Sequence, residues 1–336
     1  MRVAINGFGR IGRSVFRILD QRADAELVAI NDLFDHDALR YLLNYDTVMG
    51  RFEGALQLEG EDLVTSHGRT RMLREKEPLK LPWRELDIDV VIESTGIFTG
   101  REQLATHLEA GAKRVVLTVP AKDEIDYTVV IGVNDDGLKP EHRIISNASC
   151  TTNCLAPLAK VLHDSFGIAE GIINTVHAYT NDQRLADVPH SDWRRSRAAA
   201  ENIIPTSTGA AKAVGEVLPE LKGRLDGIAA RVPVPDGSVV DLFVELQKNV
   251  RAEDVHGAIK CAAESRRMKG ILQLMETPVV SSDVIGNSHS SIFDPAFTKV
   301  TGSRYLKCLS WYDNEWGYSN RVCDLLALIA RWEKRV

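Results

Sequence analysis

A glycine-rich turn near the N-terminus constrains the fold of this chain more than any other feature. The apolar run Arg2–Asn6 has the composition of a β-strand, Gly7–Gly12 follows it at once, and Ser14–Leu19 has the apolar spacing of a helix. A G-x-G-x-x-G turn between a strand and a helix is typical of a βαβ unit that binds the pyrophosphate of a dinucleotide. The first glycine permits the turn, the second lets the phosphates approach, and the third lets the helix pack on the strand. The predicted cofactor-binding residues of this turn are Gly7, Gly9, Arg10, Ile11 and Gly12.

The second predicted strand ends in a carboxylate that indicates which dinucleotide binds. The strand Leu27–Asn31 is followed by Asp32, which lies 20 residues after Gly12. A carboxylate at this spacing accepts hydrogen bonds from the adenosine ribose of NAD, and its charge repels the 2′-phosphate of NADP. Two other interpretations stay open, because Asp32 could cap a helix and Asp35 could be the ribose-binding carboxylate instead.

Two later strands extend the same α/β pattern. Asp89–Ser94 and Arg114–Thr118 have strand composition, and a helical segment near residues 101–111 lies between them. Strands that alternate with helices are typical of a doubly wound parallel sheet, which binds its ligand at the carboxyl ends of the strands. Residues 46–87 hold short strand-like pieces whose order the sequence does not predict. The residues expected to line the crevice are Thr95, Gly96 and Thr118.

The cysteine at position 150 has the sequence context of a nucleophile. Ile144 and Ile145 favour a strand, and Leu155–Leu162 has helical apolar spacing, so Cys150 is predicted to lie at the start of a helix. Free backbone N–H groups and the helix dipole favour an anion there, so the thiol should ionise more easily than usual. A buried structural cysteine is the alternative interpretation.

A histidine downstream could complete a catalytic pair. The segment Gly171–Thr180 has the composition of a strand and carries His177. A lone histidine is more often a surface or core residue than a catalyst, but a Cys–His pair is a common way to hold a thiolate and to move protons. We predict that Cys150 and His177 form such a pair, although the sequence does not place them in contact.

Several arginines in the second half suit a phosphorylated ligand. Arg195 lies with Arg194 and Arg197 in a polar stretch, and Arg231 lies in the strand-like Gly227–Val234. Arginine binds phosphate through forked hydrogen bonds, and an arginine in an apolar strand needs a partner. A solvated loop or an ion-paired subunit contact is the alternative for the first three.

Another helix start and several strands complete the second half. Thr208 and Gly209 precede a helical segment, and a helix start suits an anion. Strands around residues 238–247 and 305–312 indicate a sheet that is at least partly antiparallel. The final helix, Ser319–Trp332, has one apolar face that could pack back on the first domain.

Length and composition exclude several classes of protein. With 336 residues the chain is long enough for two domains, and its formal net charge of −6 argues against general binding to nucleic acid or to anionic membranes. No apolar run approaches the roughly 20 residues that span a bilayer. Five scattered cysteines do not suggest a disulfide framework, and Cys150 and Cys154 lack a second ligand pair, so no metal site is predicted. The N-terminus has no secretory signal, and we expect a cytoplasmic enzyme.

Five segments together resemble the phosphorylating, NAD-dependent glyceraldehyde-3-phosphate dehydrogenase family over the whole chain. The segment Ser149–Cys154 matches the active-site signature of that family and is highly specific. No position that the chemistry needs departs from the family pattern. The other matching segments are Ile5–Gly12, His177–Gln183, Pro205–Ala211 and Trp311–Tyr318.

The resemblance implies a role for each candidate residue. Cys150 would be the nucleophile, and His177 would be the base that activates it. Asn314 would hold the nicotinamide amide, with Tyr318 near the ring. The residues implied for inorganic phosphate are Ser149, Thr151, Thr208 and Gly209. Those implied for the phosphate of the substrate are Thr180 and Arg195, with Arg231 between the two sites.

The same resemblance implies an architecture and a reaction. A Rossmann NAD-binding domain would span residues 1–149 and be completed by the C-terminal helix 315–336. An α+β catalytic domain with a largely antiparallel or mixed sheet would span residues 150–314. The enzyme would convert D-glyceraldehyde 3-phosphate, NAD and inorganic phosphate to 1,3-bisphosphoglycerate. It would be a homotetramer in which the loop from about residue 178 to 200 packs across subunits.

Two rival functions stay open. Erythrose-4-phosphate dehydrogenase shares the Cys–His core but ends in hydrolysis, and the run Ala178–Asn181 favours the phosphorylating enzyme. A non-catalytic NAD-binding interaction protein is a different class of answer. The intact set of Cys150, His177 and Arg231 argues against it.

Overall fold

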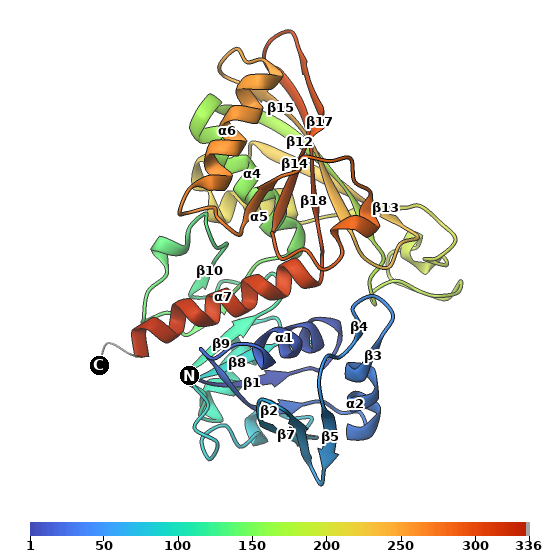
Figure 1. Cartoon of the computed structure of the whole chain (residues 1–336), viewed down its shortest axis with the longest axis vertical. Coiled ribbons are helices and arrows are strands. Elements are labelled where there is room, and N and C mark those ends of the chain that lie inside the picture. Colours follow the sequence, from blue (N-terminus) through green and yellow to red (C-terminus); the bar gives the residue numbers. More distant parts are fainter. Residues whose placement is uncertain (334–336) are drawn as a thin grey trace. The chain divides into compact units, whose positions relative to one another are not determined.

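The computed structural model describes residues 1–333, and the chain divides into two compact units (Figure 1). Unit 1 contains residues 1–129 and 135–149 and the chain from residue 319 onward. Unit 2 contains residues 130–134 and 150–318.

Helix α7 (Trp316–Glu333) begins in unit 2 and continues in unit 1. An ion pair of 3.0 Å between Arg22 and Asp324 ties this helix to the turn that follows the first helix of unit 1. Residues 334–336, the end of the predicted C-terminal helix, lie outside the described residues. Within residues 1–333, no helix is long and apolar enough to cross a membrane.

Unit 1 is built around a nine-stranded sheet in the order β10-β11-β9-β8-β1-β2-β7-β6-β5. The seven strands from β10 to β7 in this order pair in parallel, and the last two strands are antiparallel. Val90–Glu93 is buried at every position, as expected for a central strand covered on both faces. The predicted doubly wound sheet is therefore confirmed. The parallel strands are β1 (Arg2–Asn6), β2 (Glu26–Asn31), β7 (Arg69–Leu73), β8 (Val90–Glu93), β9 (Arg114–Leu117), β10 (Tyr127–Thr128) and β11 (Ile144–Ser146).

Three helices connect the parallel strands of unit 1: α1 (Arg10–Asp20), α2 (His36–Asn44) and α3 (Arg101–Glu109). The segment that the sequence did not order forms short strands between α2 and β8. Two of them make a hairpin at the sheet edge; its first strand alternates apolar and polar residues, but strands of four residues do not indicate by themselves which neighbours they pair with. These short strands are β3 (Tyr45–Asp46), β4 (Gly50–Arg51), β5 (Leu56–Glu59) and β6 (Asp62–Thr65).

Unit 2 is built around a mixed seven-stranded sheet in the order β13-β14-β12-β15-β18-β17-β16. Strand β12 (Ile168–Ala178) pairs in parallel with β14 (Leu225–Val232) and antiparallel with β15 (Ser238–Leu246). The mixed sheet confirms the predicted fold class. The remaining strands are β13 (Ile204–Ser207), β16 (Leu272–Leu274), β17 (Ser291–Thr301) and β18 (Tyr305–Tyr312).

Helices cover the sheet of unit 2 and leave an apolar surface exposed. Helix α4 (Cys150–Phe166) packs against β12, β15, β17 and β18 and also contacts α5 (Ala210–Val217) and α6 (Ala252–Glu264). Ile172, Phe243 and Tyr305 are exposed on neighbouring strands and line a hollow of about 680 Å³. These three residues are called the open sheet face below.

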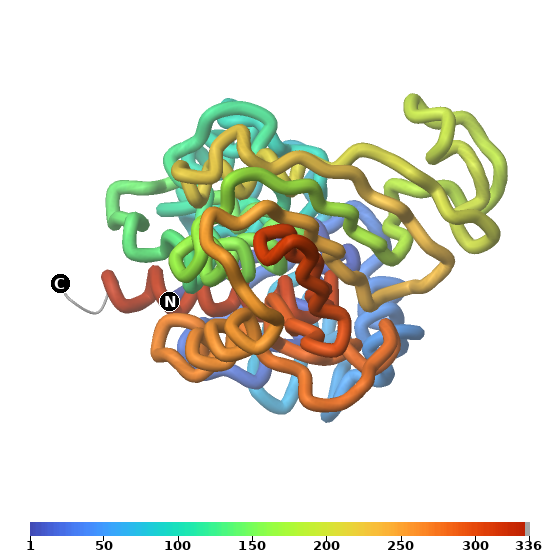
Figure 2. Tube along the Cα trace, turned by 90° about the horizontal axis from the view of Figure 1, so that it is seen from above, coloured from blue at the N-terminus to red at the C-terminus, as the bar shows by residue number. Residues whose placement is uncertain are grey.

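The loop between β12 and β13 extends away from the rest of its unit (Figure 2). It contains a short 3-10 helix, η3 (Arg194–Ser196). Leu185 and Trp193 are among its exposed side chains, each more than 80% accessible. Large apolar side chains at this exposure are unusual for a solvated loop and indicate a contact surface.

Candidate active site

The three glycines of the turn between β1 and α1 have three different environments. Gly7 has a φ of 96°, and a Cβ there would lie 2.6 Å from Thr95 N. Gly9 caps α1, and no protein atom lies within 4 Å of the place where its Cβ would be. A Cβ on Gly12 would lie 2.2 Å from Gly7 O and 3.3 Å from Ile5 Cγ2. The open space beside Gly9, at a helix start without a side-chain cap, fits a pyrophosphate.

Asp32 lies at the carboxyl end of β2, directly beside the glycine turn. Its Oδ2 accepts a hydrogen bond of 2.7 Å from Phe8 N, and its Oδ1 accepts one of 3.1 Å from Phe34 N. The rival carboxylate, Asp35, caps α2 by accepting a hydrogen bond of 3.0 Å from Ala38 N. The carboxylate that caps α2 is therefore Asp35, and Asp32 remains the residue predicted to bind the ribose.

Both arginines in the first turns of α1 are directed to other partners. Arg10 forms an ion pair with Asp46, which also accepts hydrogen bonds from two backbone N–H groups. Arg13 is buried and donates a hydrogen bond of 2.9 Å to Phe8 O. Both guanidinium groups thus have partners within the protein.

A cleft of about 680 Å³ opens at the carboxyl ends of the unit 1 strands. Leu33, Phe34 and Ile97 are exposed side chains on its wall. An apolar wall beside a few polar groups is the usual lining of a nucleotide site. The polar and glycine residues that line the cleft include Asn6, Gly7, Gly9, Asn31, Asp32, Ser94 and Thr95.

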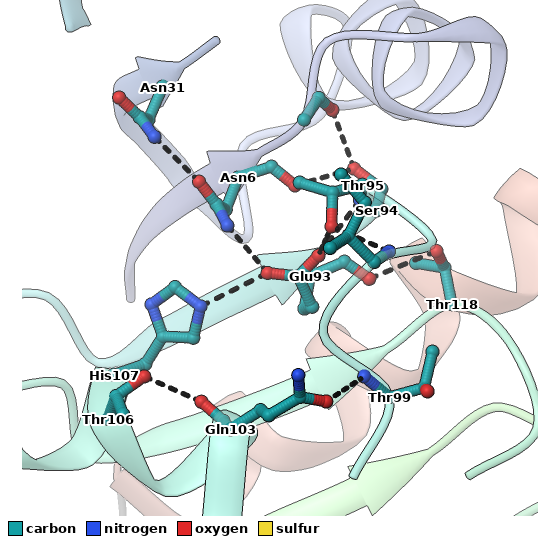
Figure 3. Close-up of polar contacts among 12 residues, drawn as sticks. Asn6, Asn31, Glu93, Ser94, Thr95, Thr99, Gln103, Thr106, His107 and Thr118 are labelled. Atoms are coloured by element: carbon teal, nitrogen blue, oxygen red, sulfur yellow. Dashed lines mark hydrogen bonds and ion pairs between the residues drawn. The ribbon is translucent and has the colours of Figure 1, made fainter. Parts of the chain in front are cut away.

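A buried polar network behind this cleft was not predicted from the sequence (Figure 3). The Glu93 carboxylate accepts hydrogen bonds from Asn6 Nδ2 at 2.6 Å, from Thr95 N at 2.9 Å and from Thr95 Oγ1 at 2.5 Å. It also lies 3.1 Å from His107 Nε2. Asn6 Oδ1 in turn accepts a hydrogen bond of 2.7 Å from Asn31 Nδ2. The network therefore joins the ends of β1, β2 and β8, where the cofactor turn begins.

The donors in this network determine the tautomer of His107. Trp83 Nε1 can only donate, and it donates a hydrogen bond of 3.0 Å to His107 Nδ1. The proton of a neutral imidazole is therefore on Nε2, which donates it to Glu93. Four hydrogen bonds therefore satisfy the oxygens of the buried Glu93 carboxyl group.

The crevice residues predicted at the strand ends differ in exposure. Thr95 lines the cleft and belongs to the Glu93 network, and Gly96 has a φ of 70° with open space beside it. Thr118 is buried, and its hydroxyl donates a hydrogen bond of 3.1 Å to Glu93 O. Thr118 therefore supports the end of β8 and does not line the cleft.

One signal for the Glu93 network was available in the sequence, because Asn6, Asn31 and Glu93 are polar residues at the ends of apolar strands.

The two predicted catalytic residues lie together in unit 2. Helix α4 begins at Cys150, and strand β12 carries His177. The Cys150 Sγ atom lies 3.5 Å from His177 Nε2, with His177 buried and Cys150 partly exposed. The structure thus brings into contact two residues that the sequence could not place together.

The register of the sheet adds a third residue to this pair. Strands β12 and β14 pair so that His177 lies opposite Arg231. Arg231 Nη1 contacts His177 Nδ1 and donates a hydrogen bond of 3.0 Å to Ala178 O. His177 Nδ1 itself lies 2.7 Å from Ala178 O. Arg231 therefore has Ala178 O as its acceptor and lies against the edge of the His177 imidazole.

The structure corrects the predicted ionisation of Cys150. A lowered pKa was expected at this helix start, but burial of the sulfur raises the pKa of the Cys150 thiol. The charge of Arg231 and hydrogen bonds from Thr151 offset this effect only in part. Burial, followed by the charge of Arg231, lowers the pKa of His177 to about 3. Desolvation thus favours the neutral forms of both the thiol and the imidazole.

A buried tyrosine joins the start of α4 to β12. Tyr312 OH lies 2.8 Å from Thr151 Oγ1 and 2.9 Å from Thr175 Oγ1. Its ring meets the His177 imidazole edge-on, with centroids 5.9 Å apart. The Thr151 hydroxyl predicted for phosphate is thus already held by Tyr312. The sequence analysis did not single out Tyr312, although it lies inside the matching segment Trp311–Tyr318.

The candidate phosphate ligands in the long loop are held by acidic and polar neighbours. Arg195 donates a hydrogen bond of 2.9 Å to Thr206 Oγ1, and it forms ion pairs with Asp182 and Asp192. Thr180 is partly exposed, and its backbone N–H donates to Gln183 Oε1 at 3.2 Å. Arg195 is therefore ion-paired within its own chain.

The second helix start is open. Helix α5 begins at Ala210, and Gly209 caps it with no protein atom within 4 Å of the place where its Cβ would be. Thr208 Oγ1 accepts a hydrogen bond of 3.2 Å from Ala210 N. Ser149 immediately precedes α4, so Ser149 and Thr208, two of the predicted phosphate ligands, both lie at helix starts.

Asn314 follows β18 and is connected through Ser238 to the strand that carries His177. Its Oδ1 accepts a hydrogen bond of 2.6 Å from Ser238 Oγ, which in turn accepts one of 3.1 Å from Ala178 N. Ala178 directly follows His177, so Ser238 connects Asn314 to the catalytic strand. Tyr318 lies in the first turn of α7 and is buried.

Residues 1–101 match the family model described as glyceraldehyde 3-phosphate dehydrogenase, NAD binding domain, and residues 149–314 match the C-terminal domain of the same family. The chain belongs to the glyceraldehyde-3-phosphate dehydrogenase family. It is accordingly an oxidoreductase whose N-terminal part binds NAD.

Three similar proteins, all described as glyceraldehyde-3-phosphate dehydrogenase, match over nearly the full length. The protein from Geobacillus stearothermophilus is 56% identical over 331 residues, which cover 98% of each chain. The one from Mycobacterium avium is 55% identical over 338 residues, which cover 98% of this chain and 99% of the relative. The one from Streptomyces coelicolor is 55% identical over 332 residues, which cover 98% of each chain.

Proposed function

We propose that the protein oxidises D-glyceraldehyde 3-phosphate with NAD and inorganic phosphate, and that it releases 1,3-bisphosphoglycerate. The observation that carries this proposal is the 3.5 Å approach of Cys150 Sγ to His177 Nε2, with Arg231 at the opposite edge of the imidazole. A thiol beside a general base at a helix start is the arrangement that covalent aldehyde oxidation needs. The similar proteins named as glyceraldehyde-3-phosphate dehydrogenase support the same reaction.

Several residues suit the cofactor, and bound NAD supplies the hydride acceptor. The open space at Gly9 receives the pyrophosphate, and Asp32 accepts hydrogen bonds from the adenosine ribose. Because Ser238 holds Asn314 Oδ1, the Asn314 amide N–H groups are the ones presented to the nicotinamide carboxamide. Tyr318 contributes an aromatic ring near the nicotinamide.

Cys150 and His177 carry out the covalent steps. The reaction needs the imidazole proton on Nδ1, donated to Ala178 O, so that Nε2 is free to accept the thiol proton; Arg231 Nη1 then donates to Ala178 O and not to Nδ1. The sulfur then attacks the aldehyde carbon, and the Cys150 backbone N–H at the start of α4 stabilises the oxyanion. The imidazolium returns its proton to that oxygen, which yields a hemithioacetal.

The same imidazole serves in the oxidation step. His177 Nε2 takes back the hydroxyl proton as hydride leaves the hemithioacetal carbon, and the carbon becomes a thioester on Cys150. Arg231 keeps the imidazole neutral between these steps, since its charge and burial both oppose protonation of His177. Inorganic phosphate then attacks the thioester carbon, which frees Cys150 as the acyl phosphate departs.

The reaction needs two anion sites, because both the substrate and the inorganic acyl acceptor carry a phosphate group. The helix starts at Ser149–Thr151 and Thr208–Gly209 suit inorganic phosphate through their backbone N–H groups. Thr180, Arg195 and Arg231 suit the phosphate of the substrate, and Arg195 would exchange its bonds to Asp182 and Thr206 for bonds to the ligand.

The exposed apolar surfaces of unit 2 support a homotetramer. The open sheet face and the exposed Leu185 and Trp193 of the long loop are too apolar to remain solvated at low cost. A subunit contact would cover both surfaces.

The five cysteines are free thiols, which suits a reducing compartment such as the cytoplasm.

The reaction is tested by following NADH with glyceraldehyde 3-phosphate or erythrose 4-phosphate, each with and without inorganic phosphate. We expect steady turnover of the triose only with phosphate, and a single burst of NADH without it, because the thioester then accumulates. Cys150→Ser should abolish the burst. Steady full-rate turnover in phosphate-free buffer, or a preference for the erythrose, would favour the hydrolytic alternative.

A further inference from the structure

Two aspartates are buried side by side next to Asn314. Asp236 and Asp313 are each only 1% exposed, and Asp236 Oδ1 accepts a hydrogen bond from the backbone of Asn314, the residue that follows Asp313, so the two carboxyl groups lie close enough to affect each other's pKa. Neither is among the residues assigned a role above. Two carboxylates in contact cannot both be ionised at modest cost, so one of them must hold a proton.

Asp313 is the member that stays ionised. Its Oδ1 accepts hydrogen bonds of 2.8 Å from Glu315 N and 2.6 Å from Trp316 N, at the start of α7. Its Oδ2 accepts a third, of 2.7 Å, from Gly286 N. Three backbone donors and the N-terminal end of a helix stabilise a carboxylate.

Asp236 is the member that holds the proton. Its Oδ1 accepts hydrogen bonds of 2.8 Å from Gly237 N and 3.2 Å from Asn314 N. Its Oδ2 is buried and receives no hydrogen bond from any donor in the described residues. A proton on Oδ2, donated to Asp313, satisfies this atom. Burial, followed by the charge of Asp313, raises the pKa of Asp236 to about 9.

We propose that Asp236 is a neutral carboxylic acid in the working enzyme, and that its hydrogen bond to Asp313 positions Asn314 for the nicotinamide. This inference rests on the proposed function for the role of Asn314, but not for the protonation of Asp236. Asp236 Oδ1 fixes the backbone of Asn314, while Ser238 fixes its side chain. Asp236 is thus a positioning residue, which acts on the cofactor through Asn314.

The charged groups around Asp236 also favour its protonated form. Glu315 adds a second negative charge from the segment before α7 and opposes ionisation of Asp236. Cys150, at the start of α4, is the other titratable group affected by Asp236, and a charge on Asp236 raises the pKa of the Cys150 thiol. The 3-10 turn beside Gly237 carries Asp283, which is exposed and caps its own turn. A neutral Asp236 therefore spares both Asn314 and Cys150 a further negative charge.

The protonation is tested on the full chain without cofactor. Asp236→Asn keeps an acceptor for Gly237 N and Asn314 N and provides an N–H donor to Asp313, but it cannot ionise. Because the folded state holds a proton that unfolded Asp releases, wild-type stability falls as pH rises from about 5 to 9. We expect the Tm of Asp236→Asn relative to wild type to increase over this range, and we expect the infrared carbonyl band of a protonated carboxyl to be absent from the variant. Equal pH dependence of Tm, with no band lost, would overturn the proposal.

The positioning role is tested by the Kd of NAD between about pH 7 and pH 10. Wild-type affinity should fall about tenfold per pH unit above the pKa of Asp236, whereas Asp236→Asn should bind equally well across the range. Asp236→Ala should bind weakly at every pH, because it loses the bond to Asn314 N. Asp283→Asn removes an exposed carboxylate nearby and should follow the wild-type profile.

The outcomes separate this inference from the proposed function. Weakening of NAD binding in Asp236→Asn at neutral pH, or an alkaline loss that persists in that variant, would refute the positioning role. The Tm and infrared measurements need neither substrate nor turnover. They would therefore show whether Asp236 is protonated even if the protein failed to oxidise the triose.

Discussion

Arg231, and not His177, supplies the positive charge that acts on Cys150. The imidazole is neutral because burial and Arg231 both lower the pKa of His177, whereas the Arg231 guanidinium is the first of the influences that favour the thiolate. The sequence pattern suggested a Cys–His ion pair. It could not reveal the desolvation of the sulfur, because burial depends on what the whole fold packs around a residue.

Replacement of Arg231 should therefore change the titration of Cys150 more than replacement of His177 does. Arg231→Leu should raise the pKa of the Cys150 thiol, while Arg231→Lys should preserve most of the effect by keeping a positive charge. His177→Asn should leave the pKa nearly unchanged but slow oxidation by about 10²–10⁴-fold through loss of the general base. The rate of alkylation by iodoacetamide as a function of pH, read at the Cys150 peptide, measures the pKa. A larger shift in His177→Asn than in Arg231→Leu would restore the ion-pair interpretation.

Cys150 should also be the residue that the substrate acylates. Burial raises the pKa of Cys154 and that of Cys308 to about 12 each, so these thiols are protonated and inaccessible at neutral pH. Cys261 is exposed on α6 and can compete for a small alkylating reagent. Peptide mapping after incubation with the triose, in wild type and in Cys261→Ser, should find the acyl group on Cys150 alone. An acyl group on Cys154 would contradict this assignment.

At the scale of single elements, the turn between β1 and α1 offers a matched pair of substitutions. Gly12→Ala should destabilise the fold by about 1–3 kcal/mol, because the new methyl group would meet Gly7 O, a backbone atom that cannot move freely. Gly9→Ala meets no protein atom and should cost roughly 1 kcal/mol or less as a weaker helix cap. It should nevertheless weaken NAD binding, since the methyl group occupies the space for the pyrophosphate. Thermal unfolding and the Kd of NAD separate the two effects, and equal losses of stability would refute the assignment.

Local patterns predicted these elements, and non-local packing decided the rest. The glycine turn, the helix start at Cys150 and the strand of His177 are each encoded within a dozen neighbouring residues. The Glu93 network was missed because its members come from separate strands, and the sequence does not say which strand ends meet. The contact between Arg231 and His177 spans 54 positions and exists only because β12 and β14 pair in one register.

At the scale of the whole molecule, the open sheet face should govern assembly. Phe243→Glu places a charge among exposed apolar side chains and should shift the protein to smaller species without unfolding it, because the side chain is already half exposed in the isolated chain. Sedimentation measures the assembly, and far-ultraviolet circular dichroism checks the fold. Lys260→Glu, an exposed change on α6, is the control for added negative charge and should assemble normally. If the sedimentation of Phe243→Glu were unchanged, the open sheet face would not be the subunit interface.

Strand pairing also determines how such a site fails on heating. His177 and Arg231 lie on strands joined over eight paired positions, and β12 has a neighbour on each side. Fraying of loops or termini leaves the two side chains together, because only rupture of the ladder separates them. Amide protons along β12 and β14 should accordingly exchange with deuterium by the same opening that abolishes the reactivity of Cys150. An enzyme built in this way keeps its chemistry nearly intact up to the melting transition and then loses it all at once.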